Sequence, residues 1–537
     1  MNRTPLTELS QEIPYTPDAA GLFDALGGRE GSDTVLLESA DVSTRSGVES
    51  LLVLSASVRL TCSGTRVLAE PLTDSGRALV AYLEDELAGF VDRSAGEGTG
   101  AVFSFPRPSA VDERERLVEP SPVLTLRALA TLPGAPEDLP LIAGGFAFDF
   151  VASFEDLPEV AAGENTFPDF QFLVAETVAE VDHRENTARL RALAAGGDAG
   201  RLEERLEGLA ARAREAAEPQ PPAAAAGAAS PGGSEPVVAR ASVGDEEFRG
   251  TVDRVREAIA AGEIYQAVPS RSFAIDCPDA FAAYRELRAA NPSPYMFYLR
   301  GLAPGGPDEL APDEPFELFG ASPESAMKFT AEDHSVEVYP IAGTRPRGRD
   351  ADGSIDHERD IRNELELRTD NKELAEHVML VDLARNDIAR VAEPGTRRVA
   401  QLLQVDRYSR VMHLVSRVVG RLSSDMDALD AYRACMNMGT LTGAPKLRAA
   451  ELLRELEGAR RGSYGGAVGY LRGGGDFDTC IVIRSGFVQG GRAVVQAGAG
   501  VVRDSRPQAE ADETAQKADA VLAAIASSQG RRLEVAR

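Results

Sequence analysis

The first part of the chain alternates apolar and polar positions. From Val35 to Leu72 the pattern has a period of two, with small turn residues between the runs, which predicts strands joined by hairpins. The same period recurs in residues 139–150 and 170–193. Residues 198–217 instead have the charged, amphipathic pattern of a helix.

A change in composition divides the chain. Residues 219–236 are biased towards Pro, Ala, Gly and Ser, which is typical of a flexible linker or a long surface loop. We therefore expect an N-terminal lobe over residues 1–236, with the linker at its end, and a second domain over residues 237–530. In that domain a strand is predicted at 264–275, and helices and strands mix without a strict βαβ rhythm. This arrangement predicts an α+β fold with large antiparallel sheets.

The charge of the chain restricts its partners. It has 57 Lys and Arg residues against 85 Asp and Glu residues, a formal net charge of −28. A surface of that sign repels phosphate backbones and anionic lipid headgroups, so neither nucleic acid nor a membrane is the expected partner. The N-terminal residues lack the apolar core of a signal peptide, and no apolar run approaches the length of a membrane span. We expect a cytoplasmic protein that acts on small molecules.

Lysine and cysteine are both scarce. Only four of the 57 basic residues are lysines, at positions 328, 372, 446 and 517, so lysine chemistry is excluded from the first half of the chain. The four cysteines lie far apart, without a spacing that suits zinc or a redox pair, and are predicted to be reduced.

Two predicted helices each carry a pair of glutamates at i, i+3. Asp370 is a suitable N-cap for the first helix, which is apolar almost all round and is therefore expected to be buried. Buried carboxylates need a cation or hydrogen bonds, so Glu373 and Glu376 are candidates for a metal or acid–base site. Alternatively, they occupy an exposed first turn, where they interact favourably with the helix dipole.

The second pair is Glu510 and Glu513. Both lie off the apolar stripe of their helix, and Lys517 follows Glu513 by four residues, which also fits a solvated face with an ion pair. The two pairs could converge on one hard cation with oxygen ligands. The pattern alone leaves both possibilities open.

The glycine-rich segments do not match nucleotide-binding motifs. Gly443 is followed by Ala-Pro where a P-loop needs Lys and then Ser or Thr, and the segment 498–500 lacks the third glycine of a dinucleotide fingerprint. Arg484 can hold a carboxylate with two hydrogen bonds, or form an ordinary ion pair at a strand end. His413 stands between apolar residues and is expected to be partly buried, where an imidazole can transfer protons.

Four ordered motifs carry a family resemblance: PIAGTRPRG at 340–348, AEHVMLVDLARND at 375–387, GTLTGAPK at 439–446, and QAGAGVVRDS followed by EADET from 496. With them the chain resembles the chorismate-utilising enzymes, and within these it is most similar to the anthranilate synthase large-component family. LLESAD at 36–41 extends the resemblance into the first lobe. It implies a sandwich of large antiparallel sheets with helices packed outside. It also implies the conversion of chorismate and ammonia to anthranilate and pyruvate in tryptophan biosynthesis.

The same resemblance implies a Mg²⁺ cofactor and a set of site residues. Glu376 and Glu513 would bind the metal, with Glu373 and Glu510 alongside. Glu324 would be the general acid that protonates the departing ring hydroxyl, His413 would handle the proton during pyruvate elimination, and Thr440 would shape the pocket. The residues expected to bind substrate are Gly343, Thr344, Tyr464, Arg484, Gly498, Ala499 and Gly500.

Two positions favour one member of the family. Ala342 stands where related aminodeoxychorismate synthases often have a nucleophilic lysine. Gln266 stands where isochorismate and salicylate synthases have a lysine that activates water, so ammonia is the expected attacking group. The alternatives are an aminodeoxychorismate synthase component I of the folate pathway and a non-catalytic tryptophan-sensing subunit.

The resemblance also implies feedback inhibition by tryptophan and a partner protein. The expected regulatory residues are Glu38, Ser39, Pro294, Tyr295 and Met296. As we align them, related enterobacterial enzymes have lysine where this chain has Glu49. No glutamine-hydrolysing domain follows the chorismate-binding region, so we expect a hetero-oligomer in which a separate glutamine amidotransferase subunit supplies the ammonia.

Overall fold

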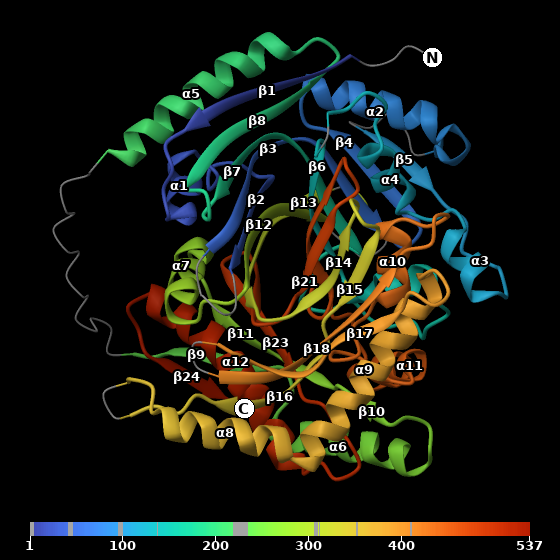
Figure 1. Cartoon of the computed structure of the whole chain (residues 1–537), viewed down its shortest axis with the longest axis vertical. Helices are drawn as coiled ribbons and strands as arrows, with labels where there is room; N and C mark the ends of the chain where they lie inside the picture. Colours follow the sequence, from blue (N-terminus) through green and yellow to red (C-terminus); the bar gives the residue numbers. More distant parts are fainter. Residues whose placement is uncertain are drawn as a thin grey trace.

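The computed structural model describes residues 5–40, 47–94, 100–136, 138–218, 235–304, 310, 312–350, 353–408 and 411–537. In these residues 22 strands form one hydrogen-bonded sheet system, and two short strands form a separate pair. All strand pairings are antiparallel except that of β9 (Val237–Ala241) with β24 (Leu533–Ala536). Helices pack on the outside of the sheets (Figure 1). The predicted α+β class with large antiparallel sheets is confirmed.

The N-terminal part follows the predicted pattern closely, since the alternating segments form strands and the segment 198–217 forms α5. Its helices are α1 (Ala19–Ala25), α2 (Asp74–Glu86), α3 (Glu113–Val118), α4 (Leu124–Ala130) and α5 (Ala199–Ala217), with 3-10 turns at Ala88–Phe90 and Phe148–Ser153. Its strands are β1 (Leu6–Ile13), β2 (Thr34–Ala40), β3 (Gly47–Ser63), β4 (Arg66–Pro71), β5 (Ala101–Ser104), β6 (Leu141–Phe146), β7 (Phe170–Asp182) and β8 (Thr187–Ala195).

The C-terminal part holds the remaining elements. Its helices are α6 (Asp245–Ala260), α7 (Ala280–Ala290), α8 (His357–Thr369), α9 (Asn371–Val391), α10 (Ala428–Cys435), α11 (Lys446–Glu457) and α12 (Pro507–Ser528). Its strands, besides β9 and β24, are β10 (Gln266–Ala267), β11 (Ser270–Asp276), β12 (Tyr295–Pro304), β13 (Pro312–Ser322), β14 (Ser325–Thr330), β15 (Ser335–Val338), β16 (Ile341–Pro346), β17 (Arg398–Arg407), β18 (Val411–Arg421), β19 (Gly443–Ala444), β20 (Ala467–Arg472), β21 (Phe477–Ile481), β22 (Ser485–Gln489) and β23 (Arg492–Gly498).

The strand predicted at 264–275 is divided in two. Gln266 and Ala267 pair with β19, whereas the chain from Ser270 onwards pairs with β23. Pro269 lies between the two pairings, where its missing N–H interrupts the hydrogen-bond ladder.

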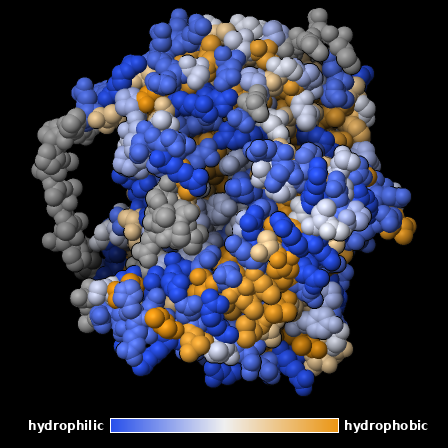
Figure 2. All heavy atoms as spheres, in the orientation of Figure 1, coloured by the Kyte–Doolittle hydropathy of each residue, from blue (hydrophilic) through white to orange (hydrophobic). Residues whose placement is uncertain are grey.

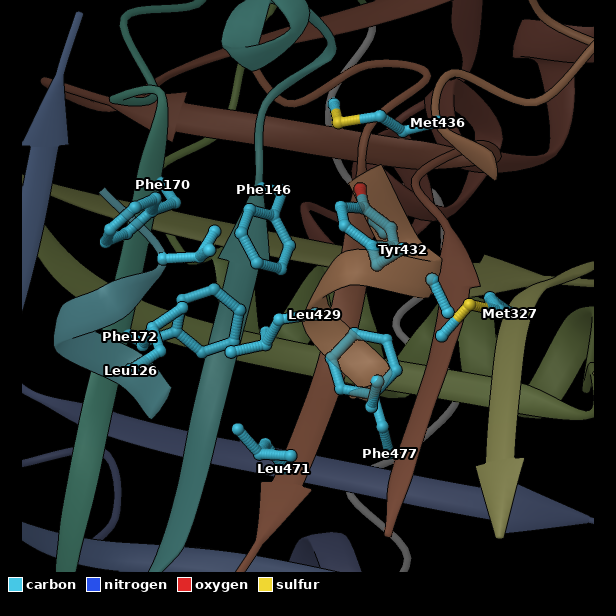
Figure 3. Packing of buried hydrophobic residues seen from close by; sticks show 14 of the residues in the cluster. Leu126, Phe146, Phe170, Phe172, Met327, Leu429, Tyr432, Met436, Leu471 and Phe477 are labelled. Atoms are coloured by element: carbon cyan, nitrogen blue, oxygen red, sulfur yellow. The ribbon is translucent and has the colours of Figure 1, made fainter. Parts of the chain in front are cut away.

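Strands from both ends of the chain share sheets and cores. β2 pairs with β12, and β6 pairs with β20. Phe146 of β6 stacks on Tyr432 of α10 with ring centroids 4.5 Å apart, and Phe477 of β21 packs against the same tyrosine (Figure 3). The N-terminal strands thus pack against the C-terminal segments that carry the family motifs and support them. Most of the expected linker, residues 219–234, lies outside the described residues, and the boundary between 1–236 and 237–530 stays a prediction.

Helix α9 begins as predicted but is less buried than predicted. The Asp370 carboxylate accepts hydrogen bonds from the backbone N–H groups of Lys372 and Glu373. Val378 is 51% exposed, although the helix packs against β16, β18 and α10. Leu402 of β17 is also exposed, and Figure 2 shows a hydrophobic area on the surface around α9 and β17.

Two further expectations concern the whole chain. All four cysteines are free and buried, as predicted for reduced core residues. Among the described residues, no helix combines the length and the apolar character needed to cross a bilayer.

Candidate active site

A cavity of about 610 Å³ opens between α9, α12, β16 and β18. Residues that are far apart in the sequence meet in its wall. Twelve of the predicted site residues line it: Glu324, Gly343, Thr344, Glu373, Glu376, His413, Thr440, Tyr464, Arg484, Gly498, Gly500 and Glu513. Ala499 and Glu510 lie just behind this wall, both almost fully buried.

The two glutamate pairs converge on this cavity. Glu373 and Glu376 come from α9, and Glu513 comes from α12. Burial raises the pKa of Glu376 to about 7; Lys372 opposes this shift, whereas Glu373, Glu513 and Glu510 add to it. Both helices therefore contribute negative charge to one site. The sequence pattern had left open whether the two helices meet in this way. The ion pair between Glu513 and Lys517, at 2.7 Å, is also present.

The carboxylates suit a hard divalent cation. The Glu376 side chain is only 17% exposed, and its Oε1 atom is buried without a hydrogen-bond partner. No group of three metal-ligating side chains is already gathered within the described residues. Mg²⁺ commonly uses one or two protein carboxylates and completes its shell with water and substrate oxygens, so this donor set fits it.

Arg484 provides a positive charge that can bind an anionic ligand in the cavity. It lies at the cavity wall just before β22 with a left-handed backbone conformation, φ +50°, and its carbonyl oxygen accepts a hydrogen bond from the Ala321 N–H. Within the described residues its guanidinium makes no hydrogen bond or ion pair. Burial lowers the pKa of this guanidinium, against the effect of Tyr464, Glu513 and Glu324. A cation held in this way favours a carboxylate ligand.

Three glycines allow the backbone to approach the cavity closely. A Cβ atom on Gly343, whose φ is +79°, would lie 3.1 Å from a Glu373 carboxylate oxygen, and one on Gly500 would lie 2.8 Å from Gln266 Nε2. A Cβ on Gly498 would lie 3.0 Å from the Tyr464 hydroxyl. Ala499 differs from its neighbours, because its N–H donates to the Pro269 carbonyl and its side chain is buried.

Glu324 and His413 have opposite protonation preferences. Burial raises the pKa of Glu324 to about 8, although Thr440, Lys517 and Arg484 oppose the shift. Burial lowers the pKa of His413 to about 4; Arg484 adds to this effect, and the Gly343 carbonyl opposes it. At neutral pH the cavity thus contains a protonated carboxyl group that can donate a proton and a neutral imidazole that can accept one.

The position of His413 follows from strand register. Antiparallel pairing of β16 with β18 puts Thr344 opposite His413, and the Thr344 Oγ1 atom lies 2.9 Å from His413 Nδ1. The Gly343 carbonyl oxygen lies 3.3 Å from the same nitrogen. If Nδ1 carries the proton, it donates to these oxygens and Nε2 remains free to act as the base.

The expected regulatory residues lie on strands β2 and β12. Ser39 pairs with Tyr295, and Glu38 pairs with Met296. Successive residues of a strand point to opposite faces, so Glu38 and Ser39 do not present their side chains to the same side. The Glu38 carboxylate instead accepts hydrogen bonds from the Tyr284 hydroxyl and from Arg288 of α7. The joint use of Glu38 and Ser39 in one pocket, with Pro294 before Tyr295, stays a prediction.

Glu49, which stands where related enzymes are expected to have lysine, is itself paired. Its carboxylate lies 2.9 Å from an Arg472 nitrogen, and the same guanidinium binds Glu180. A cation is therefore present at this place, supplied by β20 instead of β3.

Lys372 was not predicted as a cavity residue, and the apolar wall, which includes Ile341, Leu380 and Ile483, was not predicted either. Lys372 had a detectable signal, since it precedes Glu376 by four residues in a chain with very few lysines. Gln266, noted for its neutral side chain, is 5% exposed, lines the cavity and has an unpartnered Oε1 atom.

Comparison with known proteins identifies the family of this chain. A family model described as chorismate binding enzyme matches residues 82–523. Anthranilate synthase component 1 of Vibrio cholerae is 49% identical over 97% of this chain and 96% of its own length. The Escherichia coli K12 protein of the same name is also 49% identical, over 97% of each chain.

The fold has relatives among solved structures. The crystal structure of anthranilate synthase component I from Streptococcus pneumoniae TIGR4 superposes with a TM-score of 0.65 and 27% identity, over 88% of this chain and 92% of that one. A menaquinone-specific isochorismate synthase from Escherichia coli, at 17% identity and a TM-score of 0.61, shares the fold. By its family match and its near full-length relatives, the chain belongs to the chorismate-binding enzymes.

Proposed function

We propose that this chain is component I of an anthranilate synthase, a lyase that converts chorismate and ammonia to anthranilate and pyruvate in tryptophan biosynthesis. The observation that carries the proposal is one cavity lined by glutamates of both helices, by Arg484, whose guanidinium has no ion pair within the described residues, and by an acid and a base in suitable protonation states. Relatives with this name match the chain over nearly its whole length.

The proposed metal ligands are Glu376 and Glu513, with Glu373 and Glu510 behind them. A bound Mg²⁺ would supply positive charge that neutralises the ring carboxylate of chorismate beside these glutamates. Arg484 and the backbone at Gly498 and Gly500 would hold the second carboxylate of the dianion.

The chain's own groups then account for the proton transfers. Glu324 donates its proton to the ring hydroxyl, which leaves as water while ammonia forms the new C–N bond. His413 next removes the proton from the ring carbon that carries nitrogen. The C–O bond to the enolpyruvyl group breaks, the side chain leaves and takes up a proton to become pyruvate, and the ring becomes aromatic. Thr440 lies beside Glu324 and shapes this part of the pocket.

Two residues favour this reaction over those of related enzymes. Ala342 lines the cavity and has no nucleophile, which argues against an aminodeoxychorismate synthase. Gln266 offers no base to activate water, which favours ammonia, already a nucleophile. We propose that a glutamine amidotransferase subunit supplies that ammonia in a cytoplasmic hetero-oligomer.

The first test is product identification with the purified chain. With chorismate, ammonium and Mg²⁺ we expect fluorescent anthranilate and an equal amount of pyruvate, and a chelator should abolish both. Glutamine should not replace ammonium without a partner subunit. A non-aromatic amino product without pyruvate would instead identify an aminodeoxychorismate synthase, and absence of turnover would favour a sensing subunit.

The second test concerns the acid. Because Glu324 must be protonated, and its pKa is about 8, kcat/KM for chorismate should fall as the pH rises through about 8, measured at constant free ammonia. Glu324→Gln should reduce kcat by roughly 10²-fold or more and remove this pH dependence. Glu332→Gln, an exposed carboxyl outside the cavity, serves as the control. A profile that stays flat between pH 7 and pH 9 contradicts the assignment.

We also propose feedback inhibition by tryptophan at β2 and β12. Added tryptophan should lower the activity, and Ser39→Phe, which fills space on the Tyr295 side of β2, should relieve the inhibition without lowering the uninhibited rate. Activity indifferent to millimolar tryptophan refutes the regulatory proposal while leaving the catalytic one intact.

A further inference from the structure

Lysine is used selectively in this chain. Only four of its 57 basic residues are lysines, yet two of the four, Lys372 and Lys517, line the active-site cavity. Elsewhere the chain neutralises its carboxylates almost entirely with arginine. The cavity therefore departs from the composition of the rest of the molecule.

Each lysine pairs with one of the proposed metal ligands. The Lys372 ammonium lies 3.6 Å from Glu376 Oε1, and the Lys517 ammonium lies 2.7 Å from Glu513 Oε1. Both pairs join residues four apart on a single helix, one on α9 and one on α12. Lys517 also donates a hydrogen bond to the Gly498 carbonyl, at 3.0 Å.

Lys372 acts on both helices. Burial works to lower the pKa of its ammonium, but Glu376, Glu510, Glu373 and Glu513 together raise it. Two of these carboxylates belong to α9 and two belong to α12. The close contact of the ammonium is the one with Glu376, at 3.6 Å, and the other three carboxylates act on the ammonium from further away.

Glu373, which is not proposed as a direct ligand, is paired differently. Arg345 binds its carboxylate at 2.9 Å and also binds Asp370 and Glu366. A guanidinium is planar and can fix several carboxylate oxygens at once, whereas an ammonium is a compact charge on a flexible stem. The chain therefore uses a fixed cation at Glu373 and movable cations at the two proposed ligands.

We propose that Lys372 and Lys517 are exchangeable counter-ions that neutralise Glu376 and Glu513 before a divalent cation binds and then yield those carboxylate oxygens to it. The loose pairing of Glu376, whose Oε1 has no hydrogen bond, fits such an exchange. The inference rests on the proposed metal site, but not on which product the enzyme makes.

Two substitutions at each lysine position distinguish counter-ion exchange from a simple electrostatic effect of the lysine charge on metal binding. Lys→Met removes the competing cation and should tighten metal binding under either explanation. Lys→Arg keeps the charge but offers a fork that can hold both oxygens of the carboxylate. In the arginine variants, metal binding should therefore weaken only if the side-chain cation has to leave the carboxylate before the metal binds.

The experiment is titration of the metal-stripped full chain with Mn²⁺, without chorismate, followed by calorimetry and by the EPR signal of free Mn²⁺. We expect Lys372→Met and Lys517→Met to lower the dissociation constant by roughly tenfold, and Lys372→Arg and Lys517→Arg to raise it by roughly tenfold. Lys328→Met and Lys328→Arg are matched controls, since Lys328 pairs with Asp478 away from the cavity and should leave Mn²⁺ binding unchanged.

Arginine variants that bind Mn²⁺ as tightly as the wild type overturn the proposal, and so does a wild-type chain that binds no Mn²⁺. The two positions are independent, so a variant that fails to fold at one leaves the other to decide. A wild-type chain that binds Mn²⁺ and responds as predicted, but forms no anthranilate, refutes the proposed function and leaves this inference standing.

Discussion

Repulsion among four glutamates from two helices is the constraint on which this site depends. Glu373 and Glu376 on α9 face Glu513 on α12 across one cavity, with Glu510 buried behind, in a chain whose net charge is −28. Carboxylates held this close and partly removed from water are unfavourable unless cations accompany them. Burial, and to a smaller extent the neighbouring glutamates, raises the pKa of Glu376. Lysines offset this cost in part, and in the proposed reaction a divalent ion would supply positive charge to both the glutamates and the substrate carboxylate.

The fold keeps these charges in place through contacts between distant segments. β6 pairs with β20, and Phe146 stacks on Tyr432, so N-terminal strands support α10 and the motif that follows it. β13 pairs with both β12 and β22. It thereby links the expected regulatory strands to Arg484 just before β22 and to Glu324 just after its own end.

Much of this could be predicted from the sequence, because it depends on local patterns. Period-two runs identified the N-terminal strands, Asp370 was correctly identified as a helix cap, and ordered motifs identified the family. What failed depended on tertiary packing. The apolar pattern around α9 suggested burial, but Val378 is exposed, since hydrophobicity does not tell which faces find a partner. The regulatory role of Glu38 and Ser39 stays a prediction, and the strand geometry shows only that their side chains leave β2 on opposite faces. The spacing of Lys372 from Glu376 was visible in the sequence, but its place in the wall of a cavity shared with α12 is set by the fold.

The central claim is that one divalent ion joins the two helices. Anomalous diffraction from crystals of the full chain grown with Mn²⁺ tests it most directly, since manganese replaces magnesium at oxygen sites and is located by its own scattering. We expect a single strong peak in the cavity, in contact with carboxylate oxygens of both Glu376 and Glu513. A cavity without manganese, or an ion bound to only one of the two helices, would contradict it.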